Sequence, residues 1–354
     1  MGLNFDGGKR QTEYRFAAIR NGVELCPVQA VGAPRITMQS TAEIKTSISG
    51  TFVVPEEVDF LTDTLRPYMV VDGEEHQLGE YVITSVTEQR ENGIIKMSVT
   101  GYDLGVKVKM STLDSRIVSQ WEPLYMDVIM PNLVTAGIIN VIADPCEDHM
   151  QGRRTDWDVG TSRLTLINDL LQEINFDTLW FDTTGAARLT KYQAPSADNA
   201  TKIYRADEMS VIRAGVTSEL DIYEAYNDWI VVVNDANRVV NYPNNVVMTA
   251  RATNDDPASK ISVQRVGKRT APIIYLNNIA SQDALQEYVD KIKLQGMAST
   301  ETVTWTTANM PHEVGEIVVL EHPQLQGVFE ETAWTMTLQA GAAMTHTGKR
   351  LVYL

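Results

Sequence analysis

The feature that most constrains the fold is an alternation of apolar and polar residues, interrupted by tight turns, in the first third of the chain. In residues 44–54 the apolar side chains that share one parity are Ile44, Ile48, Phe52 and Val54. A period of two predicts β-strands with one buried face. Asp72-Gly73 and Asn92-Gly93 separate such runs, and both dipeptides favour hairpin turns because they tolerate positive φ. Short strands joined by tight turns indicate a barrel or sandwich over residues 1–111.

The pattern changes near Ser111 and predicts a small α/β unit over residues 112–198. Irregular apolar spacing in residues 121–142, broken by prolines, predicts short helices. A firmer helix is expected over 162–175, with Ser162 as its N-cap. Its apolar residues share one helical face, and they are Leu164, Ile167, Leu171 and Ile174. The following residues, LWFDTTGAARLTKY, predict a hairpin that turns at 183–185, and residues 195–200 form the expected linker.

Strand patterns return after residue 201. The apolar run 229–233 predicts a central barrel strand, and residues 241–280 are loop-rich. A helix is expected from Ser281, its cap, to Gly296, with an apolar stripe of Leu285, Tyr288, Val289 and Ile292 that locks this insertion onto a barrel of the same chain. Further strands are expected at 301–307, 316–321, 332–339 and 349–354. The predicted fold class is mainly β with α+β insertions.

The charge balance argues against a surface that clamps nucleic acid. Thirty basic residues against forty-six acidic ones give a formal charge of −16, whereas phosphate binding needs clustered Lys and Arg. Two cysteines, Cys26 and Cys146, predict two buried free thiols, with a disulfide as the alternative. The N-terminus has no apolar signal segment, and no apolar run approaches the ~20 residues of a membrane helix. We expect the protein to be made, folded and assembled in a reducing cytoplasm, with no membrane insertion.

The sequence assigns no catalytic, cofactor-binding or metal-binding residue. The histidines, expected to be structural, are His76, His149, His312, His322 and His346. HExxH, CxxC, GxSxG, GxxxxGK[ST] and GxGxxG are absent from the sequence. Cys146 and His149 could form a nucleophile and its base, but a loop after Pro145 explains them equally well. The tryptophans could form a carbohydrate platform, but Trp229, Trp305 and Trp334 lie in strand patterns that predict burial, which leaves Trp157 as the one expected to be exposed.

Three segments resemble tail hub and tail-associated proteins of phages and prophages of Gram-positive hosts. The first is GTSRLTLINDLLQEINFDTLWFDTTGAARLTKY, residues 160–192. The others are NMPHEVGEIVVLEH, residues 309–322, and ETAWTMTLQAGAAMTHTGKRLVYL, residues 331–354. The helix at 281–295 followed by TETVTWTTANMPHEVGE is similar to the layout of baseplate hubs of contractile tails. The resemblance covers nearly the whole chain, and its motifs are architectural.

This resemblance implies two tail-tube-like β-barrels, at 1–111 and at 199–240 with 300–354. It also implies two small accessory α/β domains, at 112–198 and 241–299. Three chains would form a homotrimeric ring whose six barrels match a six-fold tail tube. Related proteins often continue into a peptidoglycan-degrading or fibre-like region, whereas this sequence ends at Leu354 after the last expected strand, so we expect no enzyme.

The expected function is therefore that of a structural tail-tip or baseplate hub subunit at the virion tail tip. Its implied partners are the distal tail or tube protein, the tape-measure protein C-terminus and tip or fibre proteins. DNA would pass through its lumen without specific binding. The alternatives are a tail-associated peptidoglycan hydrolase, a cell-wall carbohydrate-binding tip protein, or a hexameric distal tail adaptor. The excess of acids predicts a neutral or acidic lumen, with basic residues elsewhere, among them Lys107, Lys109, Arg265, Lys268 and Arg269.

Overall fold

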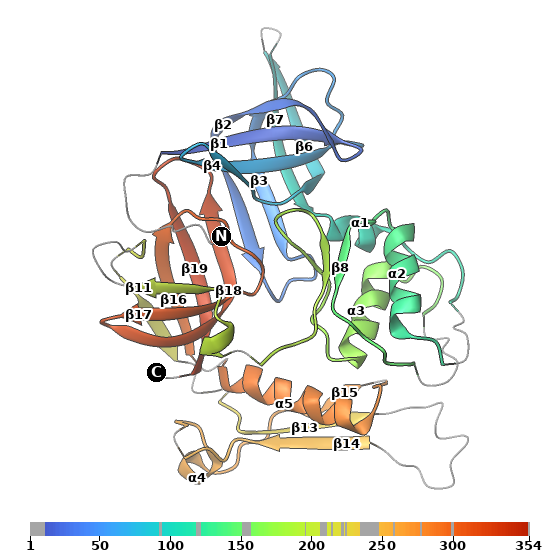
Figure 1. Ribbon diagram of the computed structural model, residues 1–354, viewed down its shortest axis with the longest axis vertical. Helices are drawn as coiled ribbons and strands as arrows, with labels where there is room; N and C mark the ends of the chain where they lie inside the picture. The colour runs from blue at the N-terminus through green and yellow to red at the C-terminus, as the bar shows by residue number, and fades with distance from the viewer. Residues whose placement is uncertain are drawn as a thin grey trace.

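The computed structural model describes residues 11–91, 94–117, 122–150, 157–194, 196–205, 211–213, 215–220, 223, 225–233, 248–257, 259–276, 278–298 and 301–352. Within these residues one 13-stranded sheet and two 3-stranded sheets are accompanied by five α-helices (Figure 1). The fold is therefore mainly β with α/β insertions, as the sequence predicts.

Seven N-terminal strands belong to the large sheet. They are β1 (Thr12–Arg20), β2 (Val23–Gln39), β3 (Thr46–Val53), β4 (Thr64–Val71), β5 (Glu74–Gln77), β6 (Tyr81–Glu91) and β7 (Ile94–Asp103). Because β1 pairs with both β2 and β4, the order β1-β4-β6-β7-β3-β2 is a closed circuit of backbone pairing. Asp72 and Gly73 have φ of 51° and 90°, the hairpin geometry expected of them. Asn92-Gly93 lies outside the described residues.

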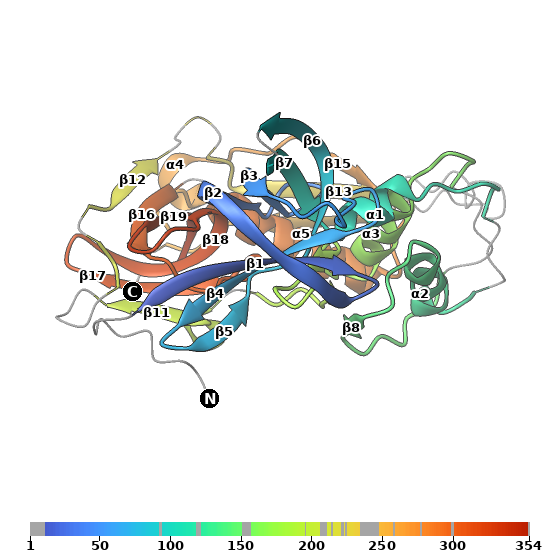
Figure 2. The same ribbon diagram turned by 90° about the horizontal axis from the view of Figure 1, so that it is seen from above.

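The rest of the large sheet comes from the second half of the chain. Its strands are β11 (Lys202–Arg205), β12 (Thr217–Leu220), β16 (Glu301–Ala308), β17 (Ile317–His322), β18 (Leu325–Thr337) and β19 (Ala343–Val352). Strand β18 pairs with β17 and β19, and residues 333–337 also pair with residues 35–39 of β2. The strands of the two ends of the chain therefore form one continuous sheet. Figure 2 shows both groups of strands from above.

The α/β unit lies beside the N-terminal strands (Figure 1). Its elements are α1 (Gly105–Met110), α2 (Tyr125–Thr135), β8 (Val141–Ala143), α3 (Arg163–Glu173), β9 (Trp180–Phe181) and β10 (Ala187–Leu189). The Ser162 hydroxyl accepts a hydrogen bond from the Thr165 backbone N–H at 3.0 Å, which confirms the predicted cap of α3. The apolar face predicted for this helix is buried, from Leu164 to Ile174.

Several local expectations in this region are wrong. One helix, α2, replaces the expected short helices and includes Pro131. The linker stays a prediction, and within it residues Ala197–Asn199 form a short 3-10 helix. Trp157 is 3% exposed, since its indole packs in the α/β core and its Nε1–H donates to Asp169 at 3.1 Å. Cys26 and Cys146 are free thiols, as expected, but both are half-buried.

The insertion forms its own 3-stranded sheet. Strands β13 (Asp228–Val233), β14 (Met248–Thr253) and β15 (Ile274–Leu276) pair in the order β14-β13-β15, with α4 (Val263–Val266) and α5 (Gln282–Ala298) beside them. The expectation that 229–233 is a central barrel strand is therefore wrong. The apolar run arises because β13 is the middle strand of this small sheet and is covered by α5.

Helix α5 confirms the predicted stripe and corrects its target. The Ser281 hydroxyl caps the helix by accepting from the Ala284 backbone N–H at 3.0 Å. Leu285, Tyr288 and Val289 are buried against β13 and β14, so the stripe packs on its own chain but on the insertion sheet rather than on a barrel. The hydroxyl group of Tyr288 also reaches α3, where it accepts a hydrogen bond from Gln172 Nε2 at 2.8 Å.

The expected helix end at Gly296 is also wrong, because α5 continues to Ala298. A Cβ at position 296 would lie 2.6 Å from Cζ2 of Trp229. This glycine therefore permits close packing of the helix on β13 rather than a left-handed cap.

No helix within the described ranges has both the length and the apolar character that crossing a membrane requires.

Candidate functional site

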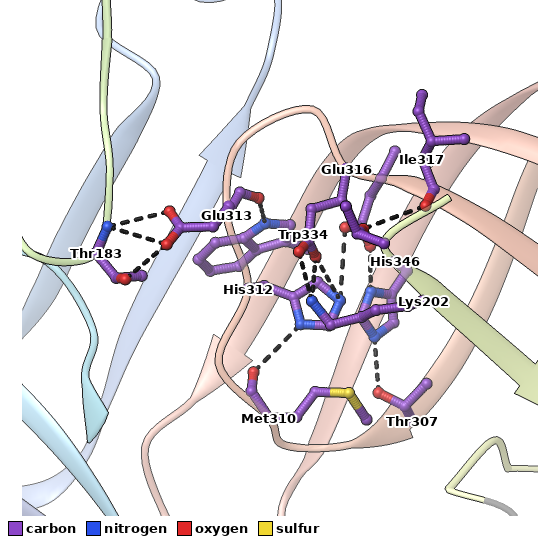
Figure 3. Close-up of polar contacts among 12 residues, drawn as sticks. Thr183, Lys202, Thr307, Met310, His312, Glu313, Glu316, Ile317, Trp334 and His346 are labelled. Carbon is purple, nitrogen blue, oxygen red and sulfur yellow. Dashed lines mark hydrogen bonds and ion pairs between the residues drawn. The ribbon is translucent and has the colours of Figure 1, made fainter. Parts of the chain in front are cut away.

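A cluster of buried polar side chains lies within the C-terminal strands, beneath the loop that joins β16 to β17 (Figure 3). The loop carries His312, Glu313 and Glu316, and Pro311 and Gly315, which has φ of 65°, shape its course. The other members come from strands, namely Lys202 and Tyr204 of β11, Thr307 of β16, Glu331 and Trp334 of β18, and His346 of β19. Segments distant in the sequence thus converge on one cluster.

His346 is held between a carboxyl group and a hydroxyl group. Its Nδ1 contacts Glu331 Oε1, and its Nε2 lies 2.7 Å from the Thr307 hydroxyl oxygen. The imidazole also stacks on Trp305, with ring centroids 5.2 Å apart and planes 6° apart. Both His346 and Glu331 have no exposed surface. The ring orientation is therefore fixed by packing and by hydrogen bonds on both nitrogens.

His312 lies beside His346, with ring centroids 4.9 Å apart. Its Nδ1 is 3.3 Å from the Met310 carbonyl oxygen, and its Nε2 is 2.8 Å from the Tyr204 hydroxyl. A carbonyl oxygen only accepts, so Nδ1 carries the proton and Nε2 accepts from Tyr204. The Nε2 atom also lies 3.6 Å from Glu331 Oε2 and 3.6 Å from Glu316 Oε2.

An ion pair between the half-buried Lys202 and the buried Glu316 completes the cluster. The Lys202 ammonium group contacts both carboxylate oxygens of Glu316, the Oε1 contact being 2.6 Å. Burial raises the pKa of Glu331, and the negative Glu316 adds to this effect. Burial also lowers the pKa of His346 to about 3 and that of His312 well below its usual value, with the nearby Lys202 charge acting in the same direction. The imidazoles are therefore neutral near pH 7.

Glu313 connects this cluster to the α/β unit. Its carboxylate accepts from the Thr183 backbone N–H at 3.0 Å and from the Thr183 hydroxyl at 2.6 Å (Figure 3). Its backbone carbonyl accepts from the Trp334 indole at 3.2 Å. Burial raises the pKa of Glu313 to about 7, although the bonds from Thr183 oppose this rise. A small cavity beside it is also lined by Glu80, which directly precedes β6, and by Asp103 at the end of β7.

The remaining sequence candidates do not join the cluster. Cys146 Sγ donates to Asp148 at 3.4 Å, while His149 Nδ1 lies 2.9 Å from the Glu122 carbonyl oxygen, so the proposed pairing of Cys146 with His149 is not formed. Trp229, Trp305 and Trp334 are buried, as expected. Sequence reasoning did not bring His312 and His346 together, because only the pairing of β16, β18 and β19 places them side by side.

Comparison with solved structures finds the same fold in proteins described as phage tail proteins. A tail protein from Neisseria meningitidis MC58 superposes with a TM-score of 0.65 at 13% identity, over 96% of this chain and 97% of that one. A 43 kDa tail protein of prophage MuSo2 from Shewanella oneidensis gives 0.64 at 12% identity, over 96% and 98%. Prophage tail protein gp18 from Listeria monocytogenes gives 0.59 at 11% identity, over 95% and 94%.

At such low identities the likeness establishes the fold alone, and it extends across these three sources rather than following one kind of host. No protein-family model matches the sequence, and no curated protein is significantly similar to it.

Proposed function

We propose that this chain is a structural hub subunit at the tip or baseplate of a phage-like tail. The observation that carries the proposal is the pairing of β2 with β18, which joins the strands from both ends of the chain into one sheet. A subunit built this way presents two groups of strands as one rigid body. The shared fold with tail proteins over almost the whole chain supports the same role.

The proposed organisation is two tube-like barrels with two accessory units. The first barrel corresponds to residues 1–111, where β1 pairs with both β2 and β4. The second corresponds to residues 199–227 with 300–354, because β13 belongs to the insertion sheet. Residues 112–198 and 228–299 are the accessory units. Three chains with two barrels each would match a six-fold tail tube, so a closed homotrimer is the proposed assembly.

The proposed partners follow from this position at the virion tail tip. They are the distal tail or tube protein above the ring, the C-terminus of the tape-measure protein, and tip or fibre proteins below. DNA would pass through the lumen of the ring without specific binding. The exposed positions of Lys107, Arg265 and Arg269 on the single chain are compatible with a lumen formed by other residues.

A non-enzymatic role is part of the proposal. The cluster around His346 is enclosed, so its carboxyl and imidazole groups have no surface that a polymeric substrate could reach. Of the described tryptophans, Trp157, Trp229, Trp305 and Trp334 are buried and Trp180 is half-buried, which argues against a flat carbohydrate platform. Peptidoglycan hydrolysis, or binding of cell-wall polysaccharide, by the purified chain would support the alternative function.

Native mass spectrometry of the assembled species tests the proposal. We expect three copies of the chain in a closed ring, alone or with the tube protein. Six identical copies would instead support the hexameric distal tail adaptor. A strictly monomeric chain in isolated tail tips would contradict both ring models.

A further inference from the structure

We propose that His312, Glu331 and His346 form a binding site for one divalent transition-metal ion of the zinc class. One ligand atom from each residue lies within 4.8 Å of the other two, and all three side chains are buried. Two imidazole nitrogens and one carboxylate oxygen form a ligand set that suits Zn²⁺ and its neighbours, whereas Ca²⁺ and Mg²⁺ prefer oxygen ligands.

The outer hydrogen bonds of the two histidines orient them as metal ligands. His312 Nδ1 donates to the Met310 carbonyl oxygen. The Thr307 hydroxyl donates to the Ala308 carbonyl oxygen at 2.8 Å, so its oxygen accepts from His346 Nε2. His346 therefore directs the lone pair of Nδ1 toward Glu331 Oε1. His312 keeps a lone pair on Nε2, which accepts from the Tyr204 hydroxyl and lies 3.6 Å from Glu331 Oε2, so this lone pair is available to a metal ion once the Tyr204 proton turns away. Metal-ligating histidines are held in this way, with the other ring N–H donated to a fixed oxygen.

An unsatisfied oxygen of Glu331 is a second, independent observation that favours a cation between these groups. Its Oε2 atom is fully buried and makes no hydrogen bond within the described part of the chain. It lies 3.6 Å from His312 Nε2, a separation too long for a hydrogen bond. Leaving a buried carboxylate oxygen unsatisfied is unfavourable, and a cation that coordinates Glu331 and both imidazoles would remove this cost.

The neighbouring ion pair adds no net charge beside the three ligands, because the charges of Lys202 and Glu316 are opposite. The Tyr204 hydroxyl, 2.8 Å from His312 Nε2, is a further oxygen that could take the fourth position of a tetrahedral ion. Bound metal would tie the β16–β17 loop to β18 and β19, from which the three ligands come. The role of such a closed site is structural, since structural zinc sites contribute directly to folding.

Metal content measured on tag-free protein tests the proposal. The chain and its Glu331→Gln, His346→Gln and His149→Gln variants are produced in zinc-supplemented medium, freed of loosely bound metal and analysed by elemental analysis and native mass spectrometry. We expect about one zinc per wild-type chain, loss of most of it in the Glu331 and His346 variants, and full retention in His149→Gln. His149 is the matched control because it is exposed and lies outside the cluster.

Cobalt substitution keeps the test decisive if a cluster variant fails to fold. Wild-type protein refolded with Co²⁺ should show a visible absorption band of a low-coordinate nitrogen and oxygen site, without a thiolate charge-transfer band from Cys26 or Cys146. Wild-type protein that holds no stoichiometric metal, both after expression with zinc and after refolding with Zn²⁺ or Co²⁺, would overturn the proposal. Equal metal in wild type and both cluster variants would also overturn it.

Discussion

At the scale of single residues, Asp228 shows how one carboxylate organises a small sheet. The side chain is buried and accepts from Arg251 Nε and Nη2 at 2.6 and 2.9 Å. The Thr253 and Thr270 hydroxyls donate to it at 3.0 and 2.7 Å, and Lys268 lies 3.5 Å away. The hydrogen bonds from Arg251 lower the pKa of this carboxyl group, and those from the two threonines add to the effect. Asp228 thus joins β13, β14 and the segment before β15.

Replacing Asp228 by Asn should lower the free energy of unfolding at neutral pH by about 1–3 kcal/mol, because charge-assisted hydrogen bonds are lost. The wild-type carboxylate has a depressed pKa in the folded state. Its contribution is therefore fully present above the ordinary value of 3.8 and is lost as the pH falls through the folded value. The difference in the free energy of unfolding between wild type and variant, measured by denaturant titration, should therefore be smaller at about pH 3 than at neutral pH.

Asp158→Asn is the matched control, because the Asp158 side chain is 70% exposed and pairs with Arg116 at the surface. Its effect should stay within about 0.5 kcal/mol. A difference between wild type and Asp228→Asn that remained constant down to about pH 3 would contradict the assigned role of the charge.

Residue environments such as these were the least predictable from sequence. Trp157 follows a polar stretch that suggests exposure, yet the α/β core encloses it. His312 and His346 carry no short motif, and their proximity depends on strand pairings between distant segments. Local patterns do not encode such pairings, so the polar cluster becomes visible only once the sheet is assembled.

At the scale of secondary-structure elements, α3 and α5 were predictable because the apolar residues of a helix recur with a period of 3.6 within one short segment. The caps at Ser162 and Ser281 were predictable for the same reason. The partner of β13 was not, because an apolar run of this length fits the middle of any covered sheet. Local periodicity thus predicted the type of element, but not which strands it pairs with.

Replacing Leu285 by Ala should destabilise the protein by about 2–5 kcal/mol, since this side chain has no exposed surface and packs between α5 and the insertion sheet. Leu294→Ala on the same helix is the control, because Leu294 is 37% exposed and should cost about 1 kcal/mol or less. Equilibrium unfolding in urea compares the two. Equal effects of both replacements would contradict the packing of the stripe.

Gly296→Ala should destabilise the protein by about 1–3 kcal/mol, because the added methyl group meets the Trp229 indole. The sign of the change in unfolding free energy distinguishes close packing from exposure, since the same replacement at an exposed helix position would stabilise the helix by about 1 kcal/mol. In a double-mutant cycle, the cost should shrink when Trp229 is replaced by the smaller Phe. A stabilising effect of Gly296→Ala alone would show that helix and strand are not closely packed here.

At the scale of the whole molecule, the units are joined by specific contacts rather than by linkers alone. Strand β18 pairs with β2, Glu313 binds Thr183 of the α/β unit, and α5 bonds to α3 through Gln172 and Tyr288. Each unit is therefore held in place by contacts with its neighbours. Such rigidity suits the proposed ring, in which three subunits must place their strands in register with a tube.

The last prediction concerns the lumen of that ring and follows from charge. Each contact between a phosphate and Lys or Arg adds affinity through counterion release, so a basic channel would retain DNA. The chain has a formal charge of −16 and therefore has acids to spare for a non-adhesive lining. Lys109 pairs with Glu43 at 2.6 Å and Lys268 with Asp228 at 3.5 Å, so two of the basic residues expected outside the lumen already have acidic partners.

We expect the lumen of the assembled ring to be neutral or acidic when the charges of its lining residues are summed from a cryo-EM structure. Lys107, Lys109, Arg265, Lys268 and Arg269 should lie on outer faces or at subunit interfaces. Replacing two lumen acids by Lys should slow DNA release from otherwise normal particles. The slowing should be larger at low salt, because added salt screens the attraction between Lys and phosphate. A lumen with clear positive charge in the wild-type ring would contradict the DNA-conduit role, even if the copy number were three.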